Sequence, residues 1–443
     1  MNLIEILLTP LYILFFYLIF KFRGRNLPNA ILKRYHMRGF WVKMFACIMF
    51  VIYYTYFTGG DTRSLYFAEG NNLFHLLLKD SSTWKYIFMK GTEFDTSLLT
   101  TKYNIGYLQD EANFLTIKIT AVLGFFTFGY FTLISLFFAC FAYSGLWKLF
   151  MFFYEQRPNM HKAFAISILF FPSVIFWSSG ILKDSLCIGA LGWFTFSIYN
   201  IIKRRKIFSN GLIILISLYI LIVIKIYILL AYAPFLLFFI FVKKLDNVKI
   251  TPFKYIFIGG IIAVIIFIFS QTYDSYQEDL GAYSVENLTS QISTLNEIVN
   301  AQTGREGSES NFNLGAEFDG TFRGMIKIAP LAIGATFYRP FIWETRKISQ
   351  VMAAIESLLL MFFTLKILFK LGPFRFIQYV VSDPMIMFCL FFAIVFALFV
   401  GASTLNFGTL VRYKIPCMPF YCIALFLIYK RAENIQKSDK AQL

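Results

Sequence analysis

The segment GGDTRSLYFAEG, residues 59–70, places a carboxylate where acid–base chemistry is possible. Two glycines end an apolar run and Asp61 follows them, with Glu69 further along. A carboxylate at a membrane surface can take the proton of a hydroxyl group that attacks a substrate. An Asp that follows glycines is also typical of a helix N-cap, where its side chain accepts backbone N–H groups. The sequence leaves both interpretations of Asp61 open.

A second pair of charges stands in FPSVIFWSSGILKDSL, residues 171–186. The small residues SSG predict a turn between two apolar runs, and Lys183 and Asp184 begin the second run. Neighbouring charges at the mouth of a helical hairpin often form a solvated pair of little consequence. Asp184 would also lie in the first turn of a helix, where an anion is favoured and where a cavity can open. Both residues are therefore candidates for substrate binding.

Two further motifs carry arginines. In FYRPFIWETRKISQVMAAIE, residues 337–356, Arg339 and Glu344 precede an apolar run. Such residues are ordinary anchors at a water–lipid boundary, but an arginine can also hold a phosphate with two parallel hydrogen bonds. Glu356 falls inside the apolar run and needs a cationic partner, for which Lys118 and Lys225 are candidates.

The fourth motif, NFGTLVRYKIPCMPF at residues 406–420, places Arg412 and Lys414 before the last apolar run. Cations there can simply extend toward water. On the expected outer face, however, they oppose the usual charge bias of membrane proteins, so an external anion would compensate them. Five cations on that face suggest a site for the anionic headgroup of a lipid. They are Lys183, Lys225, Arg339, Arg412 and Lys414.

The elements that must position these residues are transmembrane helices. The 443-residue chain is 58% hydrophobic and 20% aromatic but only 15% charged, which departs from a soluble composition. Continuous apolar runs of the length that an α-helix needs to cross a bilayer recur along the chain, whereas a β-barrel would show short alternating segments. We therefore predict an all-α polytopic bundle, a single transmembrane domain over residues 1–443. Eleven spans are expected, at about 3–20, 43–58, 129–152, 163–177, 183–201, 208–223, 226–242, 254–270, 348–368, 384–401 and 414–430.

The basic residues predict the orientation. Residues 21–43, 203–206, 243–254 and the tail from Lys430 are strongly basic, and all fall on one side if the N-terminus is outside and the C-terminus is cytoplasmic. Two long external loops then remain. Residues 59–128 contain amphipathic stretches suited to interfacial helices, and residues 271–347 include the polar stretch NAQTGREGSESNFN.

The same distribution argues against other classes of site. The net charge of +16 resides in short clusters between apolar runs, which is the positive-inside pattern, so no nucleic-acid partner is expected. The six cysteines lack the spacing of zinc ligands and the three histidines are scattered, so the sequence pattern predicts no metal site.

The motifs together resemble those of the GT-C superfamily of polytopic glycosyltransferases, which use polyprenyl-phosphate-linked sugars outside the cytoplasm. The acid in GGDTRSLYF, followed by interfacial helices, is similar to the acidic residue of that family's first external loop. FPSVIFWSSGILKDS is similar to its proline–small–acidic hairpin, and RPFIWE resembles a motif of uncharacterised bacterial proteins grouped with it. RYKIPCMPF is similar to the Arg-Tyr-x-x-Pro-x-x-Pro ending of bacterial members and of oligosaccharide repeat-unit polymerases. Asp61 departs from the family's paired acidic motif, and no sizeable external domain follows the last span.

This resemblance implies an inverting enzyme of the bacterial inner (plasma) membrane with an active site on the extracytoplasmic side. Asp61 would be the base that deprotonates an acceptor on a glycan, lipid or protein. Lys183, Arg339 and Arg412 would hold the lipid phosphate of the donor, with Asp184, Glu344 and Lys414 completing the substrate site. No organic cofactor is implied, and the need for a divalent metal ion stays open. The other partners are the membrane lipids.

Three alternatives remain open at this stage. An oligosaccharide repeat-unit polymerase would use the same donor with a lipid-linked acceptor and arginine-led catalysis. A transporter or flippase would move a lipid-linked or anionic solute, and would be favoured by charges at mid-depth in several spans. A membrane scaffold without catalytic activity is the third.

The orientation can be tested by cysteine labelling. In a variant without native cysteines, single cysteines at Ser82, Ser308 and Ser209 are exposed to an impermeant thiol reagent added to whole cells. We expect labelling at positions 82 and 308, since both loops are predicted outside, and none at position 209 beside the basic segment 203–206. Labelling at 209 without labelling at 308 would invert the topology and remove the proposed external site.

Overall fold

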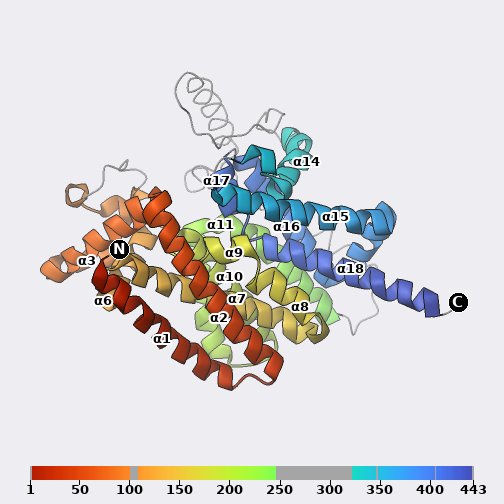
Figure 1. Cartoon of the computed structure of the whole chain (residues 1–443), viewed down its shortest axis with the longest axis horizontal. Helices are drawn as coiled ribbons and strands as arrows, with labels where there is room; N and C mark the ends of the chain where they lie inside the picture. The colour runs from red at the N-terminus through yellow and green to blue at the C-terminus, as the bar shows by residue number, and fades with distance from the viewer. Residues whose placement is uncertain (1, 100–107, 246–321, 346–347, 405, 442–443) are drawn as a thin grey trace. The chain divides into compact units, whose positions relative to one another are not determined.

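The computed structural model describes residues 2–99, 108–245, 322–345, 348–404 and 406–441, and these are helical with no β-strand among them (Figure 1). Seven of the described helices are long and apolar enough to cross a membrane, or eight if the bent pair Phe407–Tyr413 and Met418–Asn434 forms one span. The prediction of an all-α membrane protein is therefore confirmed in this coarse form. The chain divides into two compact units, Met1–Leu229 and Leu230–Leu443.

Unit 1 is built around four long helices that lie side by side (Figure 1). They are α1 (Leu3–Arg25), α2 (Ala30–Ile52), α7 (Phe131–Gln156) and α10 (Lys183–Ile202). The closest approach is that of α7 and α10, where a Cβ added to Gly192 would lie 1.9 Å from the carbonyl oxygen of Gly145. Only glycine permits such backbone contact, which is a common way for membrane helices to pack without large side chains.

The predicted first external loop folds into helical pieces within unit 1. Its main helices are α3 (Ala68–Lys79) and α6 (Glu111–Thr127), which pack against each other. Most of α6 is buried, so it is more than a helix resting on a surface. Short helices connect them: η3 (Ser81–Trp84), α4 (Lys85–Phe88), η4 (Gly91–Glu93) and η5 (Thr96–Leu98).

The second predicted span begins earlier than expected. Asn29 caps α2, accepting the N–H of Leu32 at 2.8 Å, so the helix starts at Ala30 rather than near residue 43. The exposed side chains of Lys33, Arg34 and Arg38 occupy the first turns of this helix, where long basic side chains can reach water. Charge alone was therefore a poor guide to where this helix begins.

The run at 163–177, expected to be one span, consists of short pieces. These are η6 (Pro158–Met160), α8 (His161–Phe164), η7 (Ala165–Leu169) and α9 (Pro172–Trp177). Phe171 is extended because the residue before a proline disfavours the helical conformation, and Pro172 then begins a new helix. None of these pieces is long enough to span a membrane by itself.

The runs at 208–223 and 226–242 form one helical element, α11 (Ile207–Leu245), with a break at Lys225 (φ −153°, ψ 72°). The 37 residues Ile207–Lys243 would extend about 56 Å as a straight helix, roughly twice the thickness of a bilayer core. The break lies at the point where the sequence divides the two apolar runs. The expected span 254–270 lies outside the described residues, so the count of eleven spans stays a prediction.

Within the described residues, unit 2 contains four further long helices: α14 (Phe322–Tyr338), α15 (Ile348–Val381), α16 (Pro384–Ser403) and α18 (Met418–Ala441). The short α17 (Phe407–Tyr413) and η9 (Ile342–Glu344) also belong to it. The helix α14 lies in the segment predicted as the second external loop, yet it packs closely on α16. A Cβ added to Gly401 would lie 2.1 Å from the carbonyl oxygen of Ala332, and Thr336 Oγ1 donates to the carbonyl oxygen of Ala397 at 2.7 Å.

Candidate functional site

Asp61 lies between two π-helical segments, η1 (Tyr53–Phe57) and η2 (Thr62–Phe67). Gly60 has a φ of +48°, a conformation that favours glycine, and lets the chain turn between them. Asp61 is partly exposed and makes no capping hydrogen bond, so the structure does not support its interpretation as an N-cap. π-Helical turns are rare in proteins as a whole but are often found at functional sites. Asp61 therefore stays a candidate for a catalytic residue.

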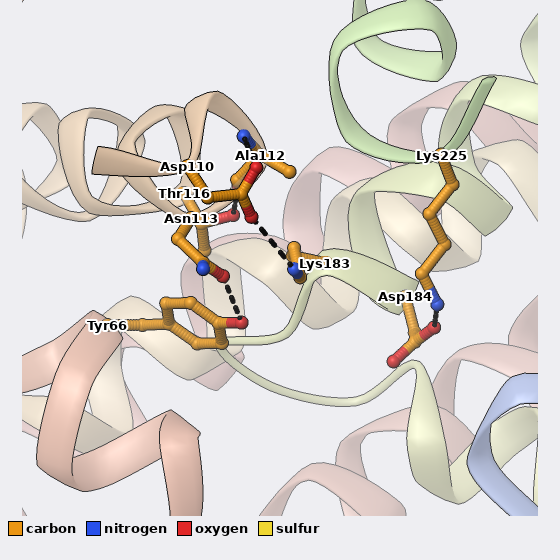
Figure 2. Close-up of polar contacts among 8 residues, drawn as sticks. All are labelled: Tyr66, Asp110, Ala112, Asn113, Thr116, Lys183, Asp184 and Lys225. Carbon is orange, nitrogen blue, oxygen red and sulfur yellow. Dashed lines mark hydrogen bonds and ion pairs between the residues drawn. The ribbon is translucent and has the colours of Figure 1, made fainter. Parts of the chain in front are cut away.

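A chain of contacts leads from η2 to the start of α10. Tyr66, one helical turn beyond Asp61, donates its hydroxyl to Asn113 Oδ1 in α6 at 2.9 Å (Figure 2). The side chain of Asp110 caps α6 by accepting the N–H of Ala112 at 3.3 Å and also faces Lys183 at the start of α10. The last turn of η2 and the starts of α6 and α10 therefore meet in one region of unit 1.

Lys183 is the cation of this region with spare hydrogen-bonding capacity. Its Nζ lies 3.7 Å from Asp110 Oδ2, which is longer than a hydrogen bond, while the two side chains are 13% and 48% exposed. An ammonium carries three donors, and within the described residues this ion pair leaves them without a close acceptor. A ligand anion that reached Lys183 would satisfy those donors.

Asp184 points away from its neighbour and forms a different pair (Figure 2). Its carboxylate pairs with the ammonium of Lys225 at the break in α11, and both side chains are almost completely buried. The solvated Lys183–Asp184 pair, one of the two interpretations that the sequence left open, is therefore not formed, since Lys183 faces Asp110 and Asp184 pairs with Lys225. Asp184 has a clear structural task, and its part in substrate binding stays a prediction.

In unit 2, Arg339 and Glu344 form a two-point ion pair. Arg339 Nε lies 3.0 and 3.2 Å from the two carboxylate oxygens of Glu344, and its Nη2 also donates to that carboxylate. Glu344 is itself fixed by the backbone N–H of Phe341 at 2.8 Å, and the guanidinium lies over the Phe407 ring at 5.2 Å. The arginine is therefore held in one orientation.

Lys414, expected at the outer mouth of the last span, is fully buried. Its ammonium donates to the carbonyl oxygen of Arg339 at 3.2 Å and to Ser357 Oγ at 3.0 Å. Glu356 lies near enough to Lys414 to interact with it electrostatically, so Lys414 is a cationic neighbour of the buried Glu356. The two candidates named from the sequence have other partners. Lys118 donates to the carbonyl oxygen of Met89, and Lys225 pairs with Asp184. Burial lowers the pKa of Lys118.

Arg412 lies in the short helix α17. The same helix contains Phe407, whose ring lies under the guanidinium of Arg339. It is partly exposed, and its guanidinium lies 5.7 Å from the Tyr413 ring. The structure thus gathers Arg339, Glu344 and Lys414 in unit 2 and places Arg412 on an adjoining helix.

Unit 1 holds the other predicted residues, Asp61, Lys183 and Asp184. The sequence interpretation missed Asp110, Asn113 and Ser357. Asp110 carried a readable signal, because an Asp that precedes Glu-Ala-Asn and an apolar run is typical of a helix start. Within the described ranges, no group of three His, Cys, Asp or Glu side chains is placed to hold a metal ion.

Comparison with known proteins adds no relative: no protein-family model, curated protein or solved structure matches this chain.

The buried Asp184–Lys225 pair is predicted to be costly to break. Asp184→Asn removes the carboxylate with which the buried ammonium of Lys225 pairs, so we expect a loss of about 3–5 kcal/mol, measured by thermal unfolding in detergent. Glu155→Gln is the matched control, because it breaks the exposed Arg205–Glu155 pair of 2.8 Å and should cost less than about 1 kcal/mol. Equal losses in the two variants would show that burial does not set the strength of the pair.

The two-point contact of Arg339 gives a separate prediction. In Arg339→Lys a single ammonium replaces the planar fork and cannot bond both oxygens of Glu344 in the same way, so we expect a loss of about 1–3 kcal/mol in thermal unfolding. Arg205→Lys, at an exposed pair, is the control and should change stability by less than about 0.5 kcal/mol. Unchanged stability of Arg339→Lys would contradict a structural role for the fork.

Proposed function

We propose that this chain is a membrane glycosyltransferase that moves a sugar or oligosaccharide from a polyprenyl-phosphate-linked donor to an acceptor outside the cytoplasm. The observation that supports the proposal most is the meeting of η2, α6 and α10 in unit 1. Tyr66 of the segment that follows Asp61 bonds to Asn113 of α6, and Asp110 at the start of α6 faces Lys183, a shielded ammonium whose donors have no close acceptor among the described residues. A base and an anion-binding cation in one region are what transfer from a lipid phosphate requires.

The proposed reaction is a single displacement. The Asp61 carboxylate takes the proton of the acceptor hydroxyl, whose oxygen forms a bond to the anomeric carbon. The bond between that carbon and the phosphate oxygen breaks on the opposite side, and its electron pair leaves with the polyprenyl phosphate. Lys183 stabilises the charge that develops on this oxygen. Attack from the opposite side inverts the anomeric configuration.

The finer features of this proposal come from the sequence. They are an external N-terminus, a cytoplasmic C-terminus, interfacial helices in residues 59–128 and an active site outside the plasma membrane. Arg339, Arg412, Glu344 and Lys414 belong to unit 2. The expected part of the two arginines in holding the lipid phosphate, and of Glu344 and Lys414 in completing the substrate site, rests on the resemblance to the GT-C superfamily. A repeat-unit polymerase would perform the same displacement with a lipid-linked acceptor.

A transporter or flippase is the second candidate, favoured by one observation. Lys225 combines a buried charge with a break in a helix long enough to span a membrane. Broken helices that carry charges inside the protein are typical of transporter binding sites. A flippase would move a lipid-linked sugar between leaflets without releasing polyprenyl phosphate, so the chemical product separates the two candidates.

Asp61→Asn tests the catalytic proposal. The full chain in nanodiscs is incubated with a panel of polyprenyl-phosphate-linked hexoses and with membrane glycolipid acceptors, and released polyprenyl phosphate is measured. We expect the substitution to lower turnover by about 10²–10⁴-fold, because the amide cannot accept the proton. Insertion should be unchanged, since Asn has nearly the same shape as Asp, and thermal unfolding of the variant shows whether it is folded.

The matched control is Asp80→Asn in the same loop. Asp80 is exposed and caps η3 through the N–H of Ser82 at 2.8 Å, a bond that Asn can also accept. It removes the same charge and should leave turnover within about twofold. Wild-type turnover in a correctly inserted Asp61→Asn protein would exclude Asp61 as the base, and equal losses in both variants would assign the effect to loop charge.

A further inference from the structure

One side of α15 carries an exposed apolar stripe along its length. Its members recur every three or four residues, the spacing of one helix face: Met352, Ile355, Leu359, Phe362, Leu365 and Phe369. The opposite side is buried against the rest of unit 2 through residues such as Ala354 and Ile367. In a helix long enough to span a membrane, an exposed apolar stripe is the side that faces lipid tails.

Charge enters this stripe at its C-terminal end. Lys366 and Lys370 both lie over the ring of Tyr429 in α18, with their Nζ atoms 5.4 and 4.9 Å from its centroid. Like charges one turn apart on a helix repel each other, and sharing one ring keeps them close. An anion placed beside the ring would offset that repulsion.

The helix then changes direction at Gly372, whose φ of +70° favours glycine, and Pro373 follows. Residues 373–381 continue as a second helical part that buries Tyr379 and Val380 and exposes Phe374, Arg375 and Ile377. Phe369 and Phe374, on either side of the break, are 85% and 87% exposed. A short helix with bulky apolar and basic residues on its exposed side is suited to the bilayer interface.

The charge of this corner is strongly positive. Five cations stand in residues 366–383 and 429–434: Lys366, Lys370, Arg375, Lys430 and Arg431. Glu433 bonds to Lys430 at 3.3 Å, and the other carboxylate of these two stretches, Asp383, is buried and caps α16. The guanidinium of Arg431 lies 5.1 Å from the Tyr379 ring, which links α18 to the second part of α15.

We propose that this corner of unit 2, formed by Lys366, Lys370, Arg375, Arg431 and the exposed Phe369, Phe374 and Ile377, binds an anionic phospholipid of the surrounding bilayer. The apolar stripe of α15 runs directly into the cations, so one occupant meets hydrocarbon along the helix and positive charge at its end. A phospholipid has both parts in that order. A soluble anion would meet only the charges, and an apolar protein surface would leave them uncompensated.

The experiment measures lipid binding to the full chain in detergent by native mass spectrometry. Phosphatidylglycerol and phosphatidylcholine with identical acyl chains are the probes. We expect the wild-type protein to prefer phosphatidylglycerol by at least about tenfold, because each cation near an anionic headgroup strengthens binding several-fold. A variant with Lys366→Gln, Lys370→Gln and Arg431→Gln should lose most of this preference, and the single changes should each lose part of it.

The matched control carries Lys203→Gln, Arg204→Gln and Lys206→Gln, which remove the same charge from the exposed turn after α10. This control should keep the preference for phosphatidylglycerol. It therefore separates the effect of the proposed site from a general effect of the protein's net charge. A variant with Phe374→Ser and Ile377→Ser should weaken binding of both lipids and leave their ratio unchanged, since it alters only the apolar part. Thermal unfolding of each variant confirms that it is folded.

Four results would overturn the proposal. The first is equal binding of the two lipids by the wild-type protein, and the second is an undiminished preference in the triple variant. The third is loss of the preference in the control. The fourth is competition by glycerol phosphate at the concentration of the lipid, which would identify a soluble phosphate as the ligand.

Discussion

The cost of placing an ionised side chain inside an apolar helical bundle determines much of this structure. Each buried charge needs a partner, because desolvation costs several kcal/mol per ion when nothing compensates it. Asp184 and Lys225 meet this requirement as a pair. The break of α11 at Lys225 belongs to the same arrangement, since it occurs at the residue whose ammonium reaches α10.

Two other buried lysines use a different solution. Lys43 donates to the carbonyl oxygen of Ile175 at 3.1 Å and to Ser178 Oγ at 2.6 Å, at the end of α9. Lys414 likewise donates to a carbonyl oxygen and a serine hydroxyl. The carbonyl groups at a helix end lack partners within the helix, so a lysine from a neighbouring helix satisfies both itself and the backbone. The C-terminal end of α9 supplies such carbonyl groups beside α2.

The need of each buried charge for a partner explains which features of the fold and site could be predicted from the sequence and which could not. Helical character, the long helices α1, α7, α10 and α16, and the division of α11 follow from apolar runs, which are local. The charge partners do not, because Lys43 and Ser178 are 135 positions apart and Lys414 and Ser357 are 57 apart. The sequence indicated that Asp184 and Lys414 need an explanation, since both are charged residues beside apolar runs. It left Asp184 open between a solvated pair and a cavity and placed Lys414 at the outer end of a span, because nothing in the local sequence distinguishes a buried charge from an accessible one.

The distinction between buried, paired charges and accessible ones also indicates which side chains could act on a substrate. A carboxylate or ammonium whose partners are fixed inside the protein must lose them before it can act on a substrate, which adds the cost of breaking the pair to every turnover. Asp184 and Lys414 are of this kind. Lys183 is different, because its contact with Asp110 is longer than a hydrogen bond, and Asp61 is partly exposed. Catalysis by positioned groups needs side chains that a substrate can reach, so Asp61 and Lys183 are the better candidates for the proposed chemistry, and Asp184 and Lys414 are better understood as structural charges, each within its own unit.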